Sequence, residues 1–499
     1  MKKHLSLLLA LLMLAPAFVS CAETEDTAAP ASDPTVGAAA EQTAEETVPE
    51  ETEISRENYP DTLPDDLDFG GETVTIHSRG DDESIYEVSV EEMTGEVVND
   101  AVYERNAMVA ERLNVKIVGF AGEKWDAYNN AIASLRASIM SADGAYDAIA
   151  GWSARIPSLS LEGLLLDLNE MPYLNLEQPW WNQSAVDELQ IAGHLYFITG
   201  NIAKTMLSAM CVYVFNQKVA NDFDVENLYD VVNEHRWTID YINDLTSRVY
   251  VDLDGDGQIG TADLYGLTSS SVNDADGYMQ GFRVSMISRD ETGLPVLDVD
   301  TERMTTIVEK VYNLMWNNPG CYAITGDGTD LKPFSEDRAL LSTTRISGIV
   351  GTLADMESDY GILPYPLLND AQTEYGTRVQ DALSLWCIPI DSKNPEMTSA
   401  VLEALAAQSY RTVTPAYFDV ALKNRYSRDQ QTAEMMDLIE QSALINFESL
   451  YNESIGNPWF VLRTLMPQKN SNFASYWATN SKVITKMLQK AVDKIQANG

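Results

Sequence analysis

The sequence predicts an α/β fold in which central sheets are flanked by helices. Two observations predict it. Short apolar runs that alternate in strand fashion are separated by longer stretches whose apolar residues recur every three or four positions. The length of 499 residues also leaves room for two or three domains with large cores, and the sequence contains no internal repeat.

The first twenty residues predict a bacterial lipoprotein signal peptide. Two lysines precede an apolar run from Leu5 to Leu14, which is too short to span a membrane. The run ends at Ala-Phe-Val-Ser-Cys, which resembles the lipobox, with Phe18 in place of the commoner leucine. We therefore expect cleavage after residue 20 and lipidation of Cys21.

Residues 21–69 predict an acidic, disordered tether. They are rich in Ala, Thr, Pro and Glu and have no apolar periodicity, so they cannot bury enough surface to fold. The whole chain carries a net charge of −43, and much of this acidity lies beyond the tether. Such a charge argues against nucleic acid or an anionic membrane surface as a partner. Membrane contact is expected only through the lipid anchor.

In the body, strand-like and helical stretches alternate. The first strands are expected at 72–80, 114–120 and 146–152, with helices between them at 98–113 and 125–140. Later strands are expected at 209–216, 338–343, 360–366 and 383–390, before a helical tail that begins near 397. Such alternation is typical of mostly parallel sheets, in which ligands gather at the carboxyl ends of the strands.

The stretch VDLDGDGQIGTADLYG, from Val251 to Gly266, predicts a structural calcium loop. It follows the D-x-D-x-D-G pattern that ends in a carboxylate at position 12, and Gly257 supplies the sharp turn. Ca²⁺ prefers hard oxygen ligands, so the expected ligands are Asp252, Asp254, Asp256, the backbone carbonyl of Gln258, and Asp263. Asp is shorter than the usual glutamate at position 12, which indicates weak binding, at roughly 10⁻⁴–10⁻³ M. The alternative is a solvated acidic turn that binds nothing.

The flanks of the loop favour a staple over a sensor. A helix is expected before the loop, with Thr238 as its N-cap. After the loop, a glycine and three consecutive serines stand where a second helix would be needed. A paired EF-hand that opens on binding is therefore not expected.

The remaining cysteines are few and widely spaced. With Cys21 lipidated, Cys211, Cys321 and Cys387 are left, an odd number with no C-x-x-C pair. Buried or free thiols are the simplest interpretation, and one disulfide among them is the alternative.

Several segments in order resemble a known family. They are YDAIAGW with the following QPWWNQ region, GHLYFITGNI, CVYVFNQKVA, WTIDYINDLT, the calcium loop with YGLTSSS, and SDYGILPYPL. Their order resembles that of the extracellular solute-binding proteins of ABC importers, the sugar-binding family 1 type, and in particular a clade of bacterial lipoproteins. The resemblance covers nearly everything after about Asp68.

The resemblance implies a two-lobed, periplasmic-binding-protein-like fold of type II, with a ligand cleft between the lobes. Lobe I would comprise residues 70–213 and 358–398, and lobe II would comprise residues 214–357 and 399–499, with the calcium loop at 252–263. It also implies a monomer on the outer face of the bacterial cytoplasmic membrane. There the protein would capture a carbohydrate, expected to be an oligosaccharide, by closure of the lobes and deliver it to an ABC permease.

Sugar sites need aromatic faces and planar hydrogen-bonding groups. The candidates are therefore the tryptophans and the arginines near the carboxyl ends of strands, where ligands bind in such sheets. Arg79 is expected in the loop after the first strand, and Trp152 ends the strand at 146–152. Trp180 and Trp181 are adjacent, and since neighbours on a regular element cannot both face one core, one of them is expected at a surface or cleft. Trp386 is expected in the core because apolar residues surround it.

The resemblance adds three candidates. Tyr278 and Arg283 lie where the second lobe of the family lines the cleft, and Arg345 follows a strand that carries an aromatic ligand contact in relatives. That aromatic residue is absent here. The candidate ligand-binding residues are thus Arg79, Trp152, Trp181, Tyr278, Arg283 and Arg345, each weighed against a role in the core, a turn or a surface ion pair.

Catalysis has little support in the sequence. It contains no H-E-x-x-H metal motif and no G-x-S-x-G nucleophile elbow, so the chain is not expected to be an enzyme. Two alternatives stay open. A glycosidase needs only two carboxylates about 5–10 Å apart, which an acidic chain can supply. A surface adhesin would need a protein partner. A peptide or another polar solute also stays open as the ligand.

Overall fold

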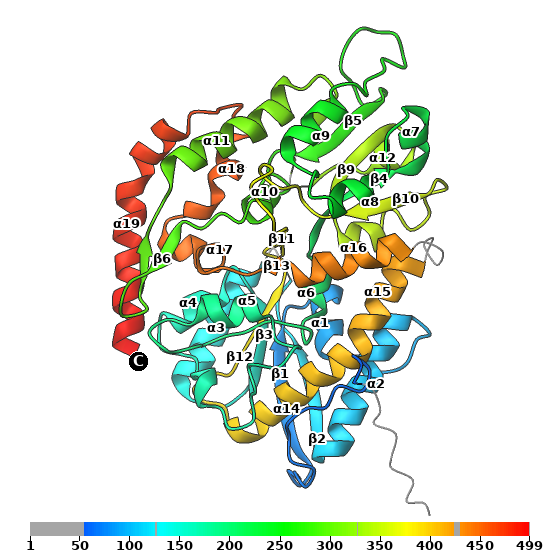
Figure 1. Ribbon diagram of the computed structural model, residues 1–499. Coiled ribbons are helices and arrows are strands. Elements are labelled where there is room, and N and C mark those ends of the chain that lie inside the picture. The colour runs from blue at the N-terminus through cyan, green and yellow to red at the C-terminus, as the bar shows by residue number, and fades with distance from the viewer. Residues whose placement is uncertain (1–53, 125–126, 327, 424–429, 499) are drawn as a thin grey trace, which may run out of the picture. The chain divides into compact units, whose positions relative to one another are not determined.

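Two separate β-sheets organise the part of the chain that the structure describes. The computed structural model describes residues 54–124, 127–326, 328–423 and 430–498. The predicted signal peptide, Cys21 and most of the predicted tether lie outside these residues. Figure 1 shows the two sheets, labelled β1, β2, β3 and β12 for one and β4, β5, β9 and β10 for the other.

The first sheet has four strands in the order β12-β3-β1-β2. Its strands are β1 (Glu72–Ser78), β2 (Val115–Ala121), β3 (Ala148–Trp152) and β12 (Ser384–Cys387). β1 pairs in parallel with both β2 and β3, and β12 joins β3 antiparallel, although more than 200 residues separate β12 from β3. The alternation of strand and helix predicted from the sequence is confirmed for this sheet.

The second sheet has five strands in the order β10-β4-β9-β5-β8. Its strands are β4 (Cys211–Asn216), β5 (Tyr265–Ser270), β8 (Cys321–Ile324), β9 (Ala339–Arg345) and β10 (Tyr360–Leu363). All six residues of β4 are buried, as expected for an apolar strand paired on both sides. β10 pairs with β4 in this sheet, a pairing that alternation alone does not reveal. The lobe boundaries drawn from the sequence stay a prediction.

Helices cover both sheets. Those packed about the first sheet include α1 (Asp82–Val88), α2 (Val97–Leu113), α3 (Tyr128–Ser141), α4 (Ile156–Ser160), α5 (Gln183–Leu189), α6 (Lys204–Ser208), α14 (Pro395–Gln408) and α15 (Thr414–Lys423). Those about the second include α7 (Gln217–Asp222), α8 (Leu228–Asn233), α9 (Ile239–Thr246), α10 (Gly277–Gly281), α12 (Lys332–Ser335), α13 (Ile346–Val350) and α16 (Gln430–Gln441).

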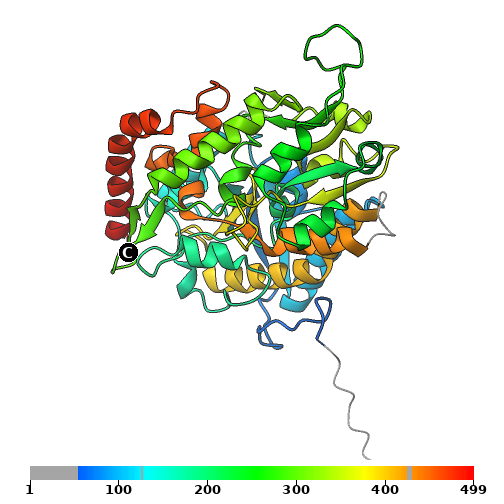
Figure 2. The same ribbon diagram turned by 45° about the horizontal axis from the view of Figure 1, so that its top comes forward.

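The rest of the chain forms short pairings and the helical tail. Two small sheets pair β6 (Ile287–Arg289) with β7 (Pro295–Leu297) and β11 (Thr377–Arg378) with β13 (Ala443–Leu444). The further helices are α11 (Thr301–Tyr312), α17 (Phe447–Leu450), α18 (Val461–Leu465) and α19 (Phe473–Asn498). In both views α19, coloured red, runs beside α11 and β7 (Figures 1 and 2). Within the described residues, no helix combines the length and the apolar character needed to cross a membrane.

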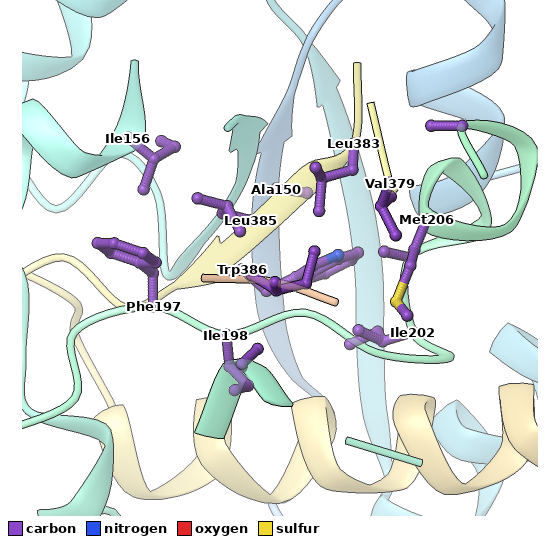
Figure 3. Packing of buried hydrophobic residues seen from close by; sticks show 14 of the residues in the cluster. Ala150, Ile156, Phe197, Ile198, Ile202, Met206, Val379, Leu383, Leu385 and Trp386 are labelled. Atoms are coloured by element: carbon purple, nitrogen blue, oxygen red, sulfur yellow. The ribbon is translucent and has the colours of Figure 1, made fainter. Parts of the chain in front are cut away.

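Trp386 lies at the centre of the core beside the first sheet, as predicted. It is fully buried, and Figure 3 shows it among Ile198, Ile202 and Met206. Its strand neighbour Leu385 and the residues before β12 complete this packing. Burying an aromatic side chain of this size contributes about 3–5 kcal/mol in typical truncation experiments.

The helix before the acidic loop begins as predicted. The Thr238 hydroxyl accepts a hydrogen bond from the backbone N–H of Tyr241 at 3.2 Å, so it is the N-cap of α9. The chain leaves the loop as strand β5 and not as a second helix. This confirms that the loop is not part of a paired EF-hand.

Residues 54–69, which the prediction included in the tether, pack against the first sheet's helices. Asp61 is nearly buried and pairs with Arg112 at 2.7 Å and with Arg411 at 2.8 Å. The two guanidinium groups overcome the effect of burial and lower the pKa of Asp61 to about 2. Leu63 is buried as well. Residues 54–69 are therefore ordered by a few specific contacts, although their composition predicted a disordered tether.

The three described cysteines, Cys211, Cys321 and Cys387, are buried free thiols. Burial raises the pKa of Cys211 to about 11 and that of Cys321 to about 12. The interpretation as buried thiols is confirmed, and the alternative of a disulfide among them is wrong.

Candidate functional site

A cavity of about 690 Å³ lies at the carboxyl ends of strands from both sheets. Its walls include Trp152 at the end of β3 and Arg345 at the end of β9, together with residues that follow β5 and β8. The volume falls within the range of about 300–1,000 Å³ that is usual for small-molecule sites. The cavity therefore lies where open α/β sheets bind ligands.

The wall from the first sheet is built around Trp152. Its backbone N–H donates to the Tyr128 hydroxyl at 3.2 Å, and its indole Nε1 donates to the backbone carbonyl of Asp381. The Arg155 guanidinium lies 4.7 Å from the centre of its ring system. These contacts hold a half-buried aromatic ring at the edge of the cavity in one orientation.

The facing wall carries a cluster of hydroxyls around Asp274. One oxygen of this nearly buried carboxylate accepts from Thr343 at 2.9 Å, from Thr329, and from the backbone N–H of Ser270 at 3.3 Å. Asp274 and Thr329 both line the cavity, and Thr344 lies beside them. A fixed acceptor beside several hydroxyl groups is the kind of surface that hydrogen-bonds the hydroxyls of a polar ligand.

Ion pairs join the segments around one end of the cavity. Arg463 from α18 pairs with Asp276 at 2.6 Å and reaches Asp381 at 3.5 Å. Arg378 lies 3.6 Å from the same Asp276 carboxylate, which is fully buried. Arg463 and Asp381 line the cavity. Charge at this end is therefore largely neutralised by partners within the protein.

Arg345 differs from the other cations near the cavity. Its side chain is partly exposed and lines the cavity. Among the residues that the structure describes, its guanidinium makes no hydrogen bond and no ion pair. This leaves five N–H donors and a positive charge directed at solvent or at a ligand.

Only two of the six predicted ligand residues, Trp152 and Arg345, line the cavity. Arg79 lies behind the wall, fully buried, where its two Nη atoms donate to the Ala382 carbonyl at 3.1 Å and its Nε to Asp81 at 2.9 Å. It therefore positions the segment that carries Asp381.

The other three lie away from the cavity. Trp181 is buried and donates to Glu403 at 3.0 Å. Tyr278 is buried against the Tyr213 hydroxyl, and Arg283 pairs with the exposed Glu374 at 3.2 Å. The expectation that one of Trp180 and Trp181 is exposed is wrong, because both indoles turn inwards to the same carboxylate.

Sequence reasoning missed several lining residues: Glu83, Asp274, Thr329, Gln380, Asp381 and Arg463. The strand-end rule could have found Asp274, which follows β5 by four residues. No local signal marks Arg463, because α18 reaches the cavity only through the tertiary fold.

The acidic loop brings three of its five predicted ligands together. Carboxylate oxygens of Asp252, Asp254 and Asp256 lie within 4.8 Å of one another. Gly257 has φ of 70°, as the predicted turn requires, and its N–H donates to Asp252 at 3.0 Å. Gln258 is exposed in the loop, and its carbonyl stays a predicted ligand.

Asp263 holds the loop closed from within. One of its oxygens accepts from the Gly260 N–H at 3.0 Å and the other from the Leu253 N–H at 3.3 Å, and two tyrosine hydroxyls add further bonds. A hydrogen bond from the Asp256 N–H lowers the pKa of Asp254, but burial and the neighbouring carboxylates raise it above its ordinary value overall. Crowded negative charge of this kind is relieved by a cation.

Comparisons with known proteins establish the fold. A scan against protein-family models finds no match, and a search of curated proteins finds none. Two of the solved structures that match most of the chain illustrate this fold. A cyclo/maltodextrin-binding protein complexed with maltotetraose shares 11% identity, covers 85% of this chain and 96% of its own, and has a TM-score of 0.53. An ABC transporter solute-binding protein from Thermotoga lettingae bound with α-D-tagatose shares 13% identity, covers 84% and 100%, and has a TM-score of 0.51.

These matches confirm the predicted fold class. The chain has the two-lobed fold of the periplasmic-binding-protein type, with one of the two sheets at the centre of each lobe. The resemblance to solute-binding proteins of sugar importers is thus confirmed at the level of the fold. The cavity lies where the two sheets of this fold face each other across their carboxyl ends.

Proposed function

We propose that this chain, which has the fold of sugar-binding proteins, is the substrate-binding lipoprotein of an ABC importer and captures an oligosaccharide between its lobes. The observation that carries the proposal is the cavity between the two sheets, with a fixed tryptophan on one wall and a hydroxyl-rich carboxylate cluster on the other. One wall can cover the apolar face of a sugar ring while the other hydrogen-bonds its hydroxyls.

The proposed contacts follow from this geometry. Trp152 would cover the ring, and Asp274 and Thr329 would bond its hydroxyls. Arg79 would act indirectly, by holding the Ala382 carbonyl and hence the segment beside Asp381. Two of the matching structures are described with maltotetraose and with α-D-tagatose, which supports a carbohydrate as the ligand class by analogy.

Delivery and location extend the same proposal. Lipidation at Cys21 would anchor the protein to the outer face of the cytoplasmic membrane, and the acidic segment that follows would let the lobes reach a permease. Closure of the lobes around the sugar would present the loaded form to that permease. A monomer suffices for this role, since one chain contributes both walls of the cavity.

We also propose that the loop 252–263 binds calcium as a staple. The three clustered carboxylates fit a hard cation, because their oxygens converge and their mutual repulsion is relieved by positive charge. Asp263 would reach the ion only by giving up some of its hydrogen bonds within the loop. The ion would fix the connection between α9 and β5 and takes no part in sugar binding.

Thermal unfolding in the presence of sugars tests the proposed function. The body, residues 54–499, would be screened against neutral and acidic mono- and oligosaccharides, and each hit would be recovered and analysed by chromatography. A sugar at 100 times its Kd adds about 2.7 kcal/mol of stability, which raises the melting temperature measurably. We expect one class to stabilise the protein and to be recovered intact. A cleaved sugar would instead indicate a glycosidase, since Glu83, Asp274 and Asp381 offer carboxylates in the same cavity.

A further inference from the structure

The charged groups of the cavity differ in how far the protein itself satisfies them. Five charged residues line it: Glu83, Asp274, Asp381, Arg345 and Arg463. Glu83 accepts a hydrogen bond from the Ser208 hydroxyl, and Asp274 accepts from two threonine hydroxyls and a backbone N–H. Each carboxylate on the walls therefore has a donor within the protein.

The two arginines are not equivalent. Arg463 is held by Asp276 and Asp381, and its guanidinium lies 3.9 Å from the centre of the Phe460 ring. Arg345, at the end of β9, has no hydrogen bond or ion pair to any described residue. Arg463 therefore forms ion pairs within the protein, whereas Arg345 forms none with the described residues.

An unpaired guanidinium at the wall of a binding cavity favours an anionic ligand. Its planar fork matches the two oxygens of a carboxylate, and hydrogen bonds between charged groups are the stronger ones. The strongly negative protein would repel an anion at long range, but charges more than about 8 Å apart are largely screened at physiological ionic strength. The ligand's carboxylate would lie much closer than this to the Arg345 guanidinium, so their attraction would be only weakly screened.

The aromatic content of the cavity points the same way. Trp152 is the one aromatic side chain among the described residues that line it, and the Arg155 guanidinium lies 4.7 Å from the centre of its ring system. A ligand bound mainly by stacking would need more aromatic surface than this. Polar and charged contacts must therefore supply much of the affinity and the orientation of the ligand.

We propose that the captured sugar is acidic, a uronic-acid-containing oligosaccharide whose carboxylate is bound by Arg345. This inference rests on the proposed sugar-binding function and specifies the class of sugar. The rest of the uronic acid ring would lie between Trp152 and the Asp274 cluster. A neutral sugar of the same size would leave Arg345 without a partner and bind more weakly.

Calorimetric titration with matched sugars tests this assignment. The probes are trigalacturonic acid with its fully methylated ester, and glucuronoxylobiose with its methyl ester, so that each acidic sugar has a neutral counterpart of the same length. Hydrogen bonds to charged groups contribute about 1.5–3 kcal/mol, so the preferred acid should bind roughly 10- to 100-fold more tightly than its counterpart. Arg345→Gln should abolish this preference, so that the acidic sugar and its neutral counterpart bind with equal affinity. Arg345→Lys, which keeps the charge without the fork, should fall between them.

A matched control is Arg136→Gln, which removes an arginine from α3 that pairs with Glu162 on the surface. It should retain the full preference. Equal binding of acidic and neutral sugars by the unmodified protein would overturn the inference while the proposed function stands. A preference that persists in Arg345→Gln would overturn the role of Arg345. Failure of every sugar to bind would overturn the proposed function together with this inference.

Discussion

At the scale of single residues, the buried carboxylate of Glu403 explains why Trp180 and Trp181 are both buried, although one of them was expected at a surface or cleft. Trp180 and Trp181 donate to its two oxygens at 3.2 and 3.0 Å. Both can turn inwards because the segment that carries them is a turn between elements and not a regular helix or strand. Adjacent side chains on a regular strand would have pointed to opposite faces.

Glu403 should make the stability of the protein depend on pH. Burial raises its pKa to about 7, although both indole hydrogen bonds oppose the rise. Its folded pKa thus lies above the unfolded value of about 4.3, so its contribution is complete below that pH and is lost as the pH rises through about 7. Between pH 4.5 and 7.5 the unfolding free energy should fall, relative to that of Glu403→Gln, by on the order of 1–3 kcal/mol.

Urea unfolding of both proteins at several pH values measures this difference. Burial also raises the pKa of Glu448 to about 7. Because Glu448 is present in both proteins, its contribution cancels in the difference between their unfolding free energies. Glu104→Gln, at an exposed position of α2, is the control and should unfold in parallel with the unmodified protein. A difference between the protein and Glu403→Gln that stays constant with pH would contradict the assignment.

At the scale of elements, the acidic loop and its helix were predictable because their signals are local. The Thr238 cap, the turn at Gly257 and the alternate carboxylates all act within a few residues of one another. The place of Asp263 was not predictable, because two tyrosine hydroxyls and two backbone N–H groups compete with the ion for its oxygens.

Calcium should stabilise the loop and the protein. Adding Ca²⁺ at millimolar concentration should raise the melting temperature, with half of the effect at roughly 10⁻⁴–10⁻³ M, because the ion relieves the repulsion among three carboxylates. Asp254→Asn should lose most of this effect. Asp143→Asn, in an exposed turn of similar hydrogen bonding, should keep it. An equal response of both variants would show that calcium acts elsewhere or not specifically.

At the scale of the whole molecule, the alternation of strands and helices predicted the fold class, whereas the cavity depends on contacts between distant segments. Trp152 and Arg345 were found because each ends a strand, which is a local signal. Arg463 comes from a short helix near the end of the chain, and its partner Asp276 lies 187 residues earlier. No periodicity or motif connects them, so only the tertiary structure brings them together.

This ion pair should stabilise the contact between distant segments. Arg463→Gln would leave the fully buried Asp276 with Arg378 alone at 3.6 Å, so the unfolding free energy should fall on the order of 3 kcal/mol. Asp276→Asn combined with Arg463→Gln should recover part of the loss, because no buried charge is then left short of partners. Chemical denaturation of Arg463→Gln, of Asp276→Asn and of the double variant measures this coupling, and strictly additive losses would contradict it.

The central claim is that an unaltered oligosaccharide binds in the cavity between the two lobes, against Trp152. Calorimetric titration of the sugar identified by the thermal screen, into the unmodified protein and into Trp152→Ala, tests it most directly. We predict one sugar per chain and a loss of affinity of roughly tenfold or more in the variant, since a buried aromatic contact of this kind contributes about 0.5–1.5 kcal/mol beyond the area it covers. Equal affinity in the two proteins would show that the sugar binds elsewhere, and the absence of any binding heat would contradict the claim itself.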